Sequence, residues 1–153
     1  MLLLPHTIVG ATIAAKIGSP WLALPLAFLS HFAADLLPHW NPQITQEMET
    51  ENHLRSGTRR FILVDTFISL IVGSIIATHF LPNVQKTMVV LLGCFLGVLP
   101  DLFESPYFFF GIKNKYLSKL MHVQKKLQWN LDLPWGVLTQ VVVVILCFWL
   151  LSS

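Results

Sequence analysis

The chain has 153 residues, of which 54% are hydrophobic and only 12% are charged, and its formal net charge is +2. Because soluble domains carry about 25% charged residues, this composition argues against an ordinary soluble domain and predicts one all-α integral membrane domain whose main partner is the lipid bilayer. The small net charge gives no reason to expect nucleic acid as a partner.

Five apolar segments predict a bundle of about five membrane-spanning helices. They cover residues 2–17, 21–38, 61–80, 86–103 and 133–151. The first is short for a span of about 20 residues, but tilt or local thinning of the bilayer would accommodate it. Gly10 and Ala14 in the first segment, and Gly93 and Gly97 in the fourth, are small residues four apart, which favours close helix packing.

Two polar segments separate these spans. Residues 39–60 are predicted as a loop, with or without a short surface helix, and residues 113–128 as an amphipathic helix on the membrane surface, with lysines on one face. If the spans alternate in direction, residues 39–60 and 107–130 lie on one side and carry every Lys and Arg except Lys16 and Lys86. The positive-inside rule then predicts an inner-membrane protein with a cytoplasmic N-terminus and an external C-terminus.

Histidines and carboxylates gather at the cytoplasmic ends of the predicted spans. His31, Asp35 and His39 recur every four residues, so a helix stacks them on one face. The same topology places four more polar side chains at that depth: His6, Asp65, Asp101 and Glu104. Buried carboxylates need a cation, and the spans supply no Lys or Arg there. Histidine and carboxylate together form the ligand set of a divalent metal, and this mixture favours Zn²⁺, Mn²⁺ or Fe²⁺.

A weak internal repeat relates the first two spans to the third and fourth. His6-Thr7 opens the first span as Asp65-Thr66 opens the third, and Asp35-Leu36 closes the second as Asp101-Leu102 closes the fourth. Both hairpins start on the same side, so the repeat would be parallel. Two facing half-sites would make a dinuclear centre, although the sequence leaves open whether the pattern is a repeat or a coincidence.

Three motifs together resemble those of a known family: PHTIVG near the N-terminus, SHFAADLLPHW closing the second span and GVLPD closing the fourth. That family consists of small prokaryotic inner-membrane proteins described as membrane-bound metal-dependent hydrolases. The resemblance implies a multi-span fold and metal-dependent hydrolysis. The positions that match its site are His6, His31, Asp35, His39 and Asp101. The family's later histidine motif corresponds here to His122 alone, which lies on the lysine face of the surface helix.

The leading hypothesis is a membrane-embedded hydrolase in which one or two metal ions lower the pKa of a bound water. Asp65 or Glu104 would be the general base, and the nearby Arg59, Arg60 and lysine face would suit an anionic, lipid-like substrate. Two alternatives remain open. One is a non-catalytic scaffold whose polar cluster fixes helix packing, and the other is a metal-ion or proton transporter, which would need a homo-oligomer to form a path.

Overall fold

The computed structural model describes residues 1–112 and 114–153. Within these residues the chain forms seven helices and no strand, which confirms the all-α prediction. The helices are α1 (Leu3–Lys16), α2 (Pro20–Asp35), α3 (Ile44–Glu51), α4 (Ser56–Thr78), α5 (Val84–Phe110), α6 (Lys115–Leu127) and α7 (Trp135–Ser152). The predicted spans correspond to α1, α2, α4, α5 and α7. The predicted surface helix corresponds to α6, and its first position, 113, lies outside the described residues.

Three helices, α4, α5 and α7, are long and apolar enough to cross a membrane. The prediction of five spans is therefore confirmed only for these three. α1 and α2 have 14 and 16 residues, which at about 1.5 Å per residue is shorter than a hydrocarbon core of about 30 Å. Proline contributes to the short length of α2, because Pro20 occupies its first turn and Pro38 follows soon after its end at Asp35.

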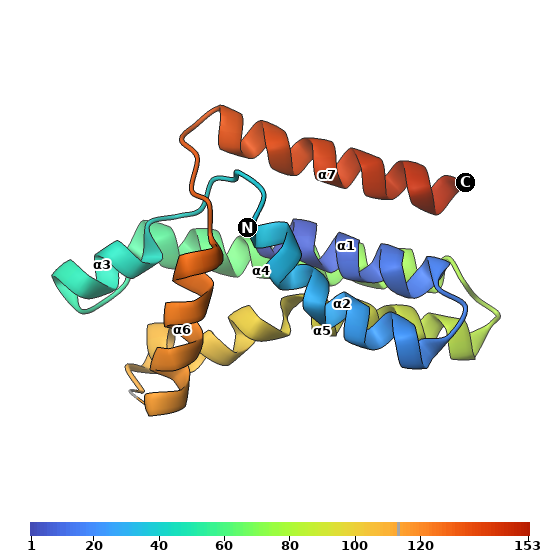
Figure 1. Cartoon of the computed structure of the whole chain (residues 1–153), viewed down its shortest axis with the longest axis horizontal. Coiled ribbons are helices and arrows are strands. Elements are labelled where there is room, and N and C mark those ends of the chain that lie inside the picture. Colours follow the sequence, from blue (N-terminus) through green and yellow to red (C-terminus); the bar gives the residue numbers. More distant parts are fainter. Residues whose placement is uncertain (113) are drawn as a thin grey trace.

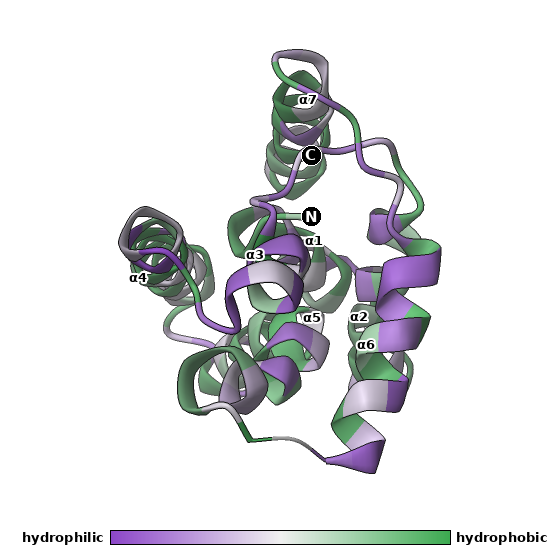
Figure 2. Ribbon diagram, turned by 90° about the vertical axis from the view of Figure 1, so that its left-hand side faces the viewer, coloured by the Kyte–Doolittle hydropathy of each residue, from purple (hydrophilic) through white to green (hydrophobic). Residues whose placement is uncertain are grey.

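α1 is the central helix of the bundle, and it packs against α2, α4, α5 and α7 (Figure 2). Its contact with α5 is made through glycine. A Cβ atom added at Gly10 would lie 2.3 Å from the carbonyl oxygen of Gly93, and one added at Gly97 would lie 2.6 Å from that of His6. The two backbones therefore touch, and the glycines singled out in the sequence hold His6 directly against α5.

The polar elements gather at one end of the molecule (Figure 1). The N-terminus, α3 and α6 lie at this end, whereas the α1–α2 turn, the α4–α5 turn and the C-terminus lie at the other. Both hairpins therefore run in the same direction, as a parallel repeat requires. The ribbon of α6 is mostly hydrophilic and that of the long helices mostly hydrophobic (Figure 2). We call the first end the polar end.

Candidate metal centre

Three side chains from three helices converge at the polar end. His6 of α1, His31 of α2 and Asp101 of α5 each bring one ligand atom to within 4.8 Å of the other two. The two histidines are 1% and 0% exposed, and their rings stack with centroids 4.0 Å apart. The close crossing of α1 and α5 makes this possible, because His6 lies beside the Gly97 contact. The structure thus brings together three of the five predicted metal ligands.

His31 is held in an orientation that suits a metal ligand. Its Nδ1 donates a hydrogen bond of 2.9 Å to the carbonyl oxygen of Gly97. A carbonyl only accepts, so this bond places the hydrogen on Nδ1 and, in the neutral ring, leaves a lone pair on Nε2. That Nε2 lies 3.5 Å from Asp101 Oδ1 and 3.6 Å from Asp35 Oδ2. Metal-binding histidines are commonly oriented in this way by a backbone carbonyl.

Asp35 lies against three histidines, His6, His31 and His39, and also contacts the N-terminus of the chain. Its Oδ1 is 3.3 Å from His6 Nε2 and 3.6 Å from His39 Nε2, and it accepts a hydrogen bond from the ammonium group of Met1. This ammonium is the cation that the spans lack. Asp35 therefore joins the predicted cluster with a charged partner that sequence reasoning missed.

His39 is buried beside Asp35 but stands outside the group formed by His6, His31 and Asp101. Its Nδ1 donates to the carbonyl oxygen of Leu37 at 2.7 Å, and its backbone N–H donates to the carbonyl oxygen of Trp129 at 3.0 Å. Burial lowers the pKa of His39, so the neutral ring is favoured at pH 7. His39 thus presents a neutral imidazole next to Asp35, and its Nε2 lies 3.1 Å from the side-chain nitrogen of Asn41.

Asp65 makes a different set of contacts. Its Oδ2 accepts a hydrogen bond of 2.8 Å from the backbone N–H of Leu3, and its Oδ1 accepts one of 3.3 Å from that of Leu4. These N–H groups belong to the first turn of α1, where helices lack internal acceptors and favour negative charge. Asp65 therefore caps α1 from α4. These contacts do not test its predicted role as a general base.

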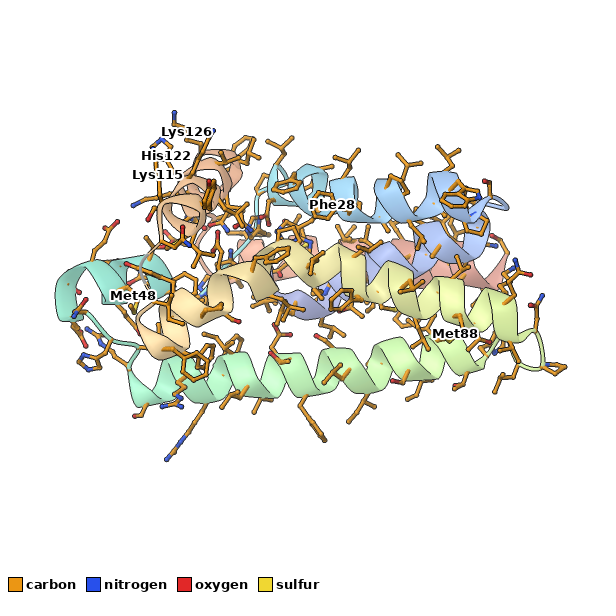
Figure 3. All side chains as sticks on the ribbon, turned by 90° about the horizontal axis from the view of Figure 1, so that it is seen from below. Phe28, Met48, Met88, Lys115, His122 and Lys126 are labelled. Atoms are coloured by element: carbon orange, nitrogen blue, oxygen red, sulfur yellow. The ribbon has the colours of Figure 1, made fainter. Side chains whose placement is uncertain are left out.

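Glu104 is buried beside a polar cavity of about 260 Å³ between α3, α5 and α6. It is 8% exposed, and its Oε1 has no hydrogen-bond partner. The cavity is also lined by Tyr107, His122 and Gln124. At its rim, Lys125 of α6 donates to Glu49 of α3 over 2.9 Å. His122 is exposed beside Lys115 and Lys126 on the outer side of α6 (Figure 3).

Two glutamines belong to this region although sequence reasoning did not select them. Gln124 is 1% exposed, and its Nε2 lies 3.0 Å from His31 Nε2 and 3.1 Å from Asp101 Oδ1. Gln140 of α7 accepts a hydrogen bond from the backbone N–H of Leu2 and donates one to the carbonyl oxygen of Trp40, both 2.9 Å long. An amide inside an apolar span was the available signal for Gln140. No comparable signal marks Gln124 in the sequence, because this residue belongs to a polar helix.

An apolar cavity of about 150 Å³ lies between α1, α4 and α5. Its lining includes Thr7, Gly73 and Phe95.

Comparisons with family models, curated proteins and solved structures gave no match to this chain. The resemblance based on three short motifs therefore stays a prediction.

Proposed function

We propose that this protein is a membrane-embedded, metal-dependent hydrolase whose divalent ion is held by His6, His31 and Asp101. The observation that carries this proposal is the convergence of two fully buried imidazoles on a carboxylate, with Nε2 of His31 directed toward Asp101. Neither ring nitrogen of His6 makes a hydrogen bond, although Nε2 lies 3.3 Å from Asp35 Oδ1, so the neutral ring keeps a lone pair that could bind an ion. Two histidines and one carboxylate are typical of catalytic zinc and non-haem iron sites.

The chain offers a base and an entrance next to this centre. A divalent ion supplies Lewis acidity and lowers the pKa of a water that it binds. Glu104 lies three residues after Asp101 on α5, and its unpartnered Oε1 is the group that would take up a proton. The polar cavity beside Glu104 would admit the substrate. Asp35 and His39 lie close enough to assist, or to hold a second ion.

The surroundings favour a lipid-like substrate at the inner face of a cell membrane. α2 exposes Trp21, Leu22 and Leu29, which are 91%, 56% and 56% exposed, so we place α1 and α2 in the bilayer beside α4, α5 and α7. The polar end carries Arg59, Arg60 and the α6 lysines, and the positive-inside rule assigns it to the cytoplasm together with the N-terminus. The apolar cavity between α1, α4 and α5 would suit an acyl chain.

Elemental analysis of the purified protein tests the metal, and turnover of a phosphoester tests the hydrolysis. We expect Zn, Mn or Fe at near-stoichiometric amounts in the wild type, strong loss of metal in His31→Ala, and no loss in the control His53→Ala, whose imidazole is exposed. Hydrolysis should stop on chelation and return with added metal. Wild-type protein that is folded but binds no metal, or turnover that a chelator leaves intact, would overturn the proposal.

One observation favours a non-catalytic scaffold as the second candidate. Asp65 and Gln140 bind backbone groups of neighbouring segments, and Asp35 binds the terminal ammonium. Such bonds fix helix packing without any chemistry. If this is the whole function, Asp35→Ala lowers stability while the wild type neither retains metal nor hydrolyses a phosphoester.

A further inference from the structure

α6 inserts one side chain into the bundle, and that side chain touches the proposed metal centre. Within α6, where every residue is described, Gln124 alone is buried, whereas Lys115, His122 and Lys126 lie on its outer side (Figure 3). The amide group of Gln124 donates toward His31 Nε2 at 3.0 Å and to Asp101 Oδ1 at 3.1 Å. These are two of the three ligand atoms, so α6 meets the centre directly.

Only one end of the Gln124 amide has hydrogen-bond partners. Its nitrogen has two acceptors, whereas its oxygen, Oε1, is buried and accepts no hydrogen bond. The NH₂ group and the oxygen of a carboxamide have nearly the same size, and a half-turn about the last side-chain bond exchanges them without moving the helix. Gln124 can therefore present either a donor or an acceptor at the same point of the centre.

The position of the Gln124 amide nitrogen matches that of a metal ligand. Bonds of about 2.1 Å in a tetrahedral site separate neighbouring ligand atoms by about 3.4 Å. His31 Nε2 and Asp101 Oδ1 are 3.5 Å apart, which is close to this spacing. The amide nitrogen of Gln124 lies 3.0 and 3.1 Å from these two atoms. These distances are shorter than the ligand spacing because hydrogen bonds join the atoms. An amide NH₂ group repels a cation, whereas an amide oxygen binds one.

We propose that Gln124 is the fourth protein ligand of this centre. Its amide turns over, and Oε1 of Gln124 then binds the divalent cation. The inference rests on the proposed metal site but not on hydrolysis. The ligands then come from α1, α2, α5 and α6, so the ion fastens α6 to the bundle beside the polar cavity. Glu104 lines the same cavity as Gln124.

Metal titration of the full-length chain in detergent tests the ligand. Zn²⁺ and Co²⁺ are the probes, and the absorption bands of Co²⁺ report the coordination number. Gln124→Leu keeps the size of the side chain but removes the oxygen, so we expect at least about tenfold weaker binding and a changed Co²⁺ spectrum. Gln124→Glu keeps an oxygen and should bind at least as tightly as the wild type. Gln128→Leu is the matched control, because it lines the same cavity one turn later.

Hydrogen exchange of the α6 amides gives a second readout that is independent of activity. Zn²⁺ should slow exchange in α6 in the wild type and in Gln124→Glu, but not in Gln124→Leu. If Gln124→Leu binds Zn²⁺ with wild-type affinity and gives the wild-type Co²⁺ spectrum, Gln124 is not a ligand although the metal site stands. If the wild type binds neither ion, the site itself is absent and the Gln124 ligand falls with it.

Discussion

Each predicted acidic residue meets a different kind of partner, and the partner indicates what the residue does. Asp35 faces the Met1 ammonium and three histidines, although its Oδ2 accepts no hydrogen bond. Asp65 accepts two backbone N–H groups. Glu104 keeps one buried oxygen without a donor. Asp65, whose two oxygens both accept hydrogen bonds, stabilises structure, whereas the free oxygen of Glu104 lies beside a polar cavity and can take up a proton.

Asp65→Ala separates a structural role from a catalytic one. The substitution leaves the first-turn N–H groups of Leu3 and Leu4 without an acceptor, so we expect a loss of about 2 kcal/mol in unfolding free energy, with metal content unchanged. Asp65→Asn keeps one acceptor oxygen and should lose less. Asp132→Ala, at an exposed position, is the control. Unfolding in mixed micelles measures the stability, and loss of metal in Asp65→Ala would show that Asp65 belongs to the centre.

Glu104→Gln tests the base. The amide has nearly the same shape as the carboxylic acid but cannot take up a proton, so turnover should fall by about 10²–10⁴-fold while metal affinity is retained. Glu49→Gln changes an exposed carboxylate at the rim of the same cavity and should leave turnover close to that of the wild type. Phosphoester hydrolysis at saturating metal is the measurement. Equal rates for Glu104→Gln and the wild type would remove Glu104 from the mechanism.

At the scale of the helices, the glycine contact between α1 and α5 supports the metal centre. Gly97 has two functions there: it lets the backbone of His6 approach, and its own carbonyl oxygen accepts the Nδ1–H of His31. A shift of α5 away from α1 therefore disturbs two proposed ligands at once, His6 and His31. Packing and metal binding should respond together to one small substitution.

Gly97→Ala tests this coupling. The added Cβ would lie 2.6 Å from the carbonyl oxygen of His6, a backbone atom that cannot turn aside, so we expect destabilisation of about 1–3 kcal/mol and weaker Zn²⁺ binding. Gly57→Ala is the control, because a Cβ there meets nothing within 4 Å. Thermal unfolding and Zn²⁺ titration are measured on the same samples. A Gly97→Ala protein as stable as the wild type would contradict the close crossing.

Helix positions and small-residue contacts were predictable from the sequence because both depend on local patterns. Apolar runs predicted the helices, and the spacing of Gly93 and Gly97 predicted close helix packing, which the structure places against α1. The same patterns could not reveal that Gln124 meets His31 or that Asp65 caps α1, since hydrogen-bond partners are set by tertiary packing. The apolar pattern also overestimated the length of α2: the span was predicted to end at Pro38, whereas the helix ends at Asp35. An apolar run does not show where the helix inside it ends.

On the scale of the whole molecule, polarity divides the structure into two ends. The polar end holds the N-terminus, α3, α6 and the candidate metal centre, and the opposite end holds both hairpin turns and the C-terminus (Figure 1). The basic residues that the structure describes follow the same division, with only Lys16 and Lys86 of these near the far turns. If the bundle spans a membrane, the candidate metal centre faces one compartment, which we predict from the positive-inside rule to be the cytoplasm.

Cysteine labelling tests this orientation. In a chain whose buried Cys94 and Cys147 are replaced by alanine, Asn83→Cys reports the α4–α5 turn and Glu49→Cys reports α3; both positions are exposed. An impermeant maleimide should label Asn83→Cys in intact expressing cells and Glu49→Cys only after the membrane is broken. The reverse pattern would place the metal centre at the outer face, with substrates drawn from outside. Labelling of both from outside would mean that α4 does not cross the membrane, because Glu49 and Asn83 flank it.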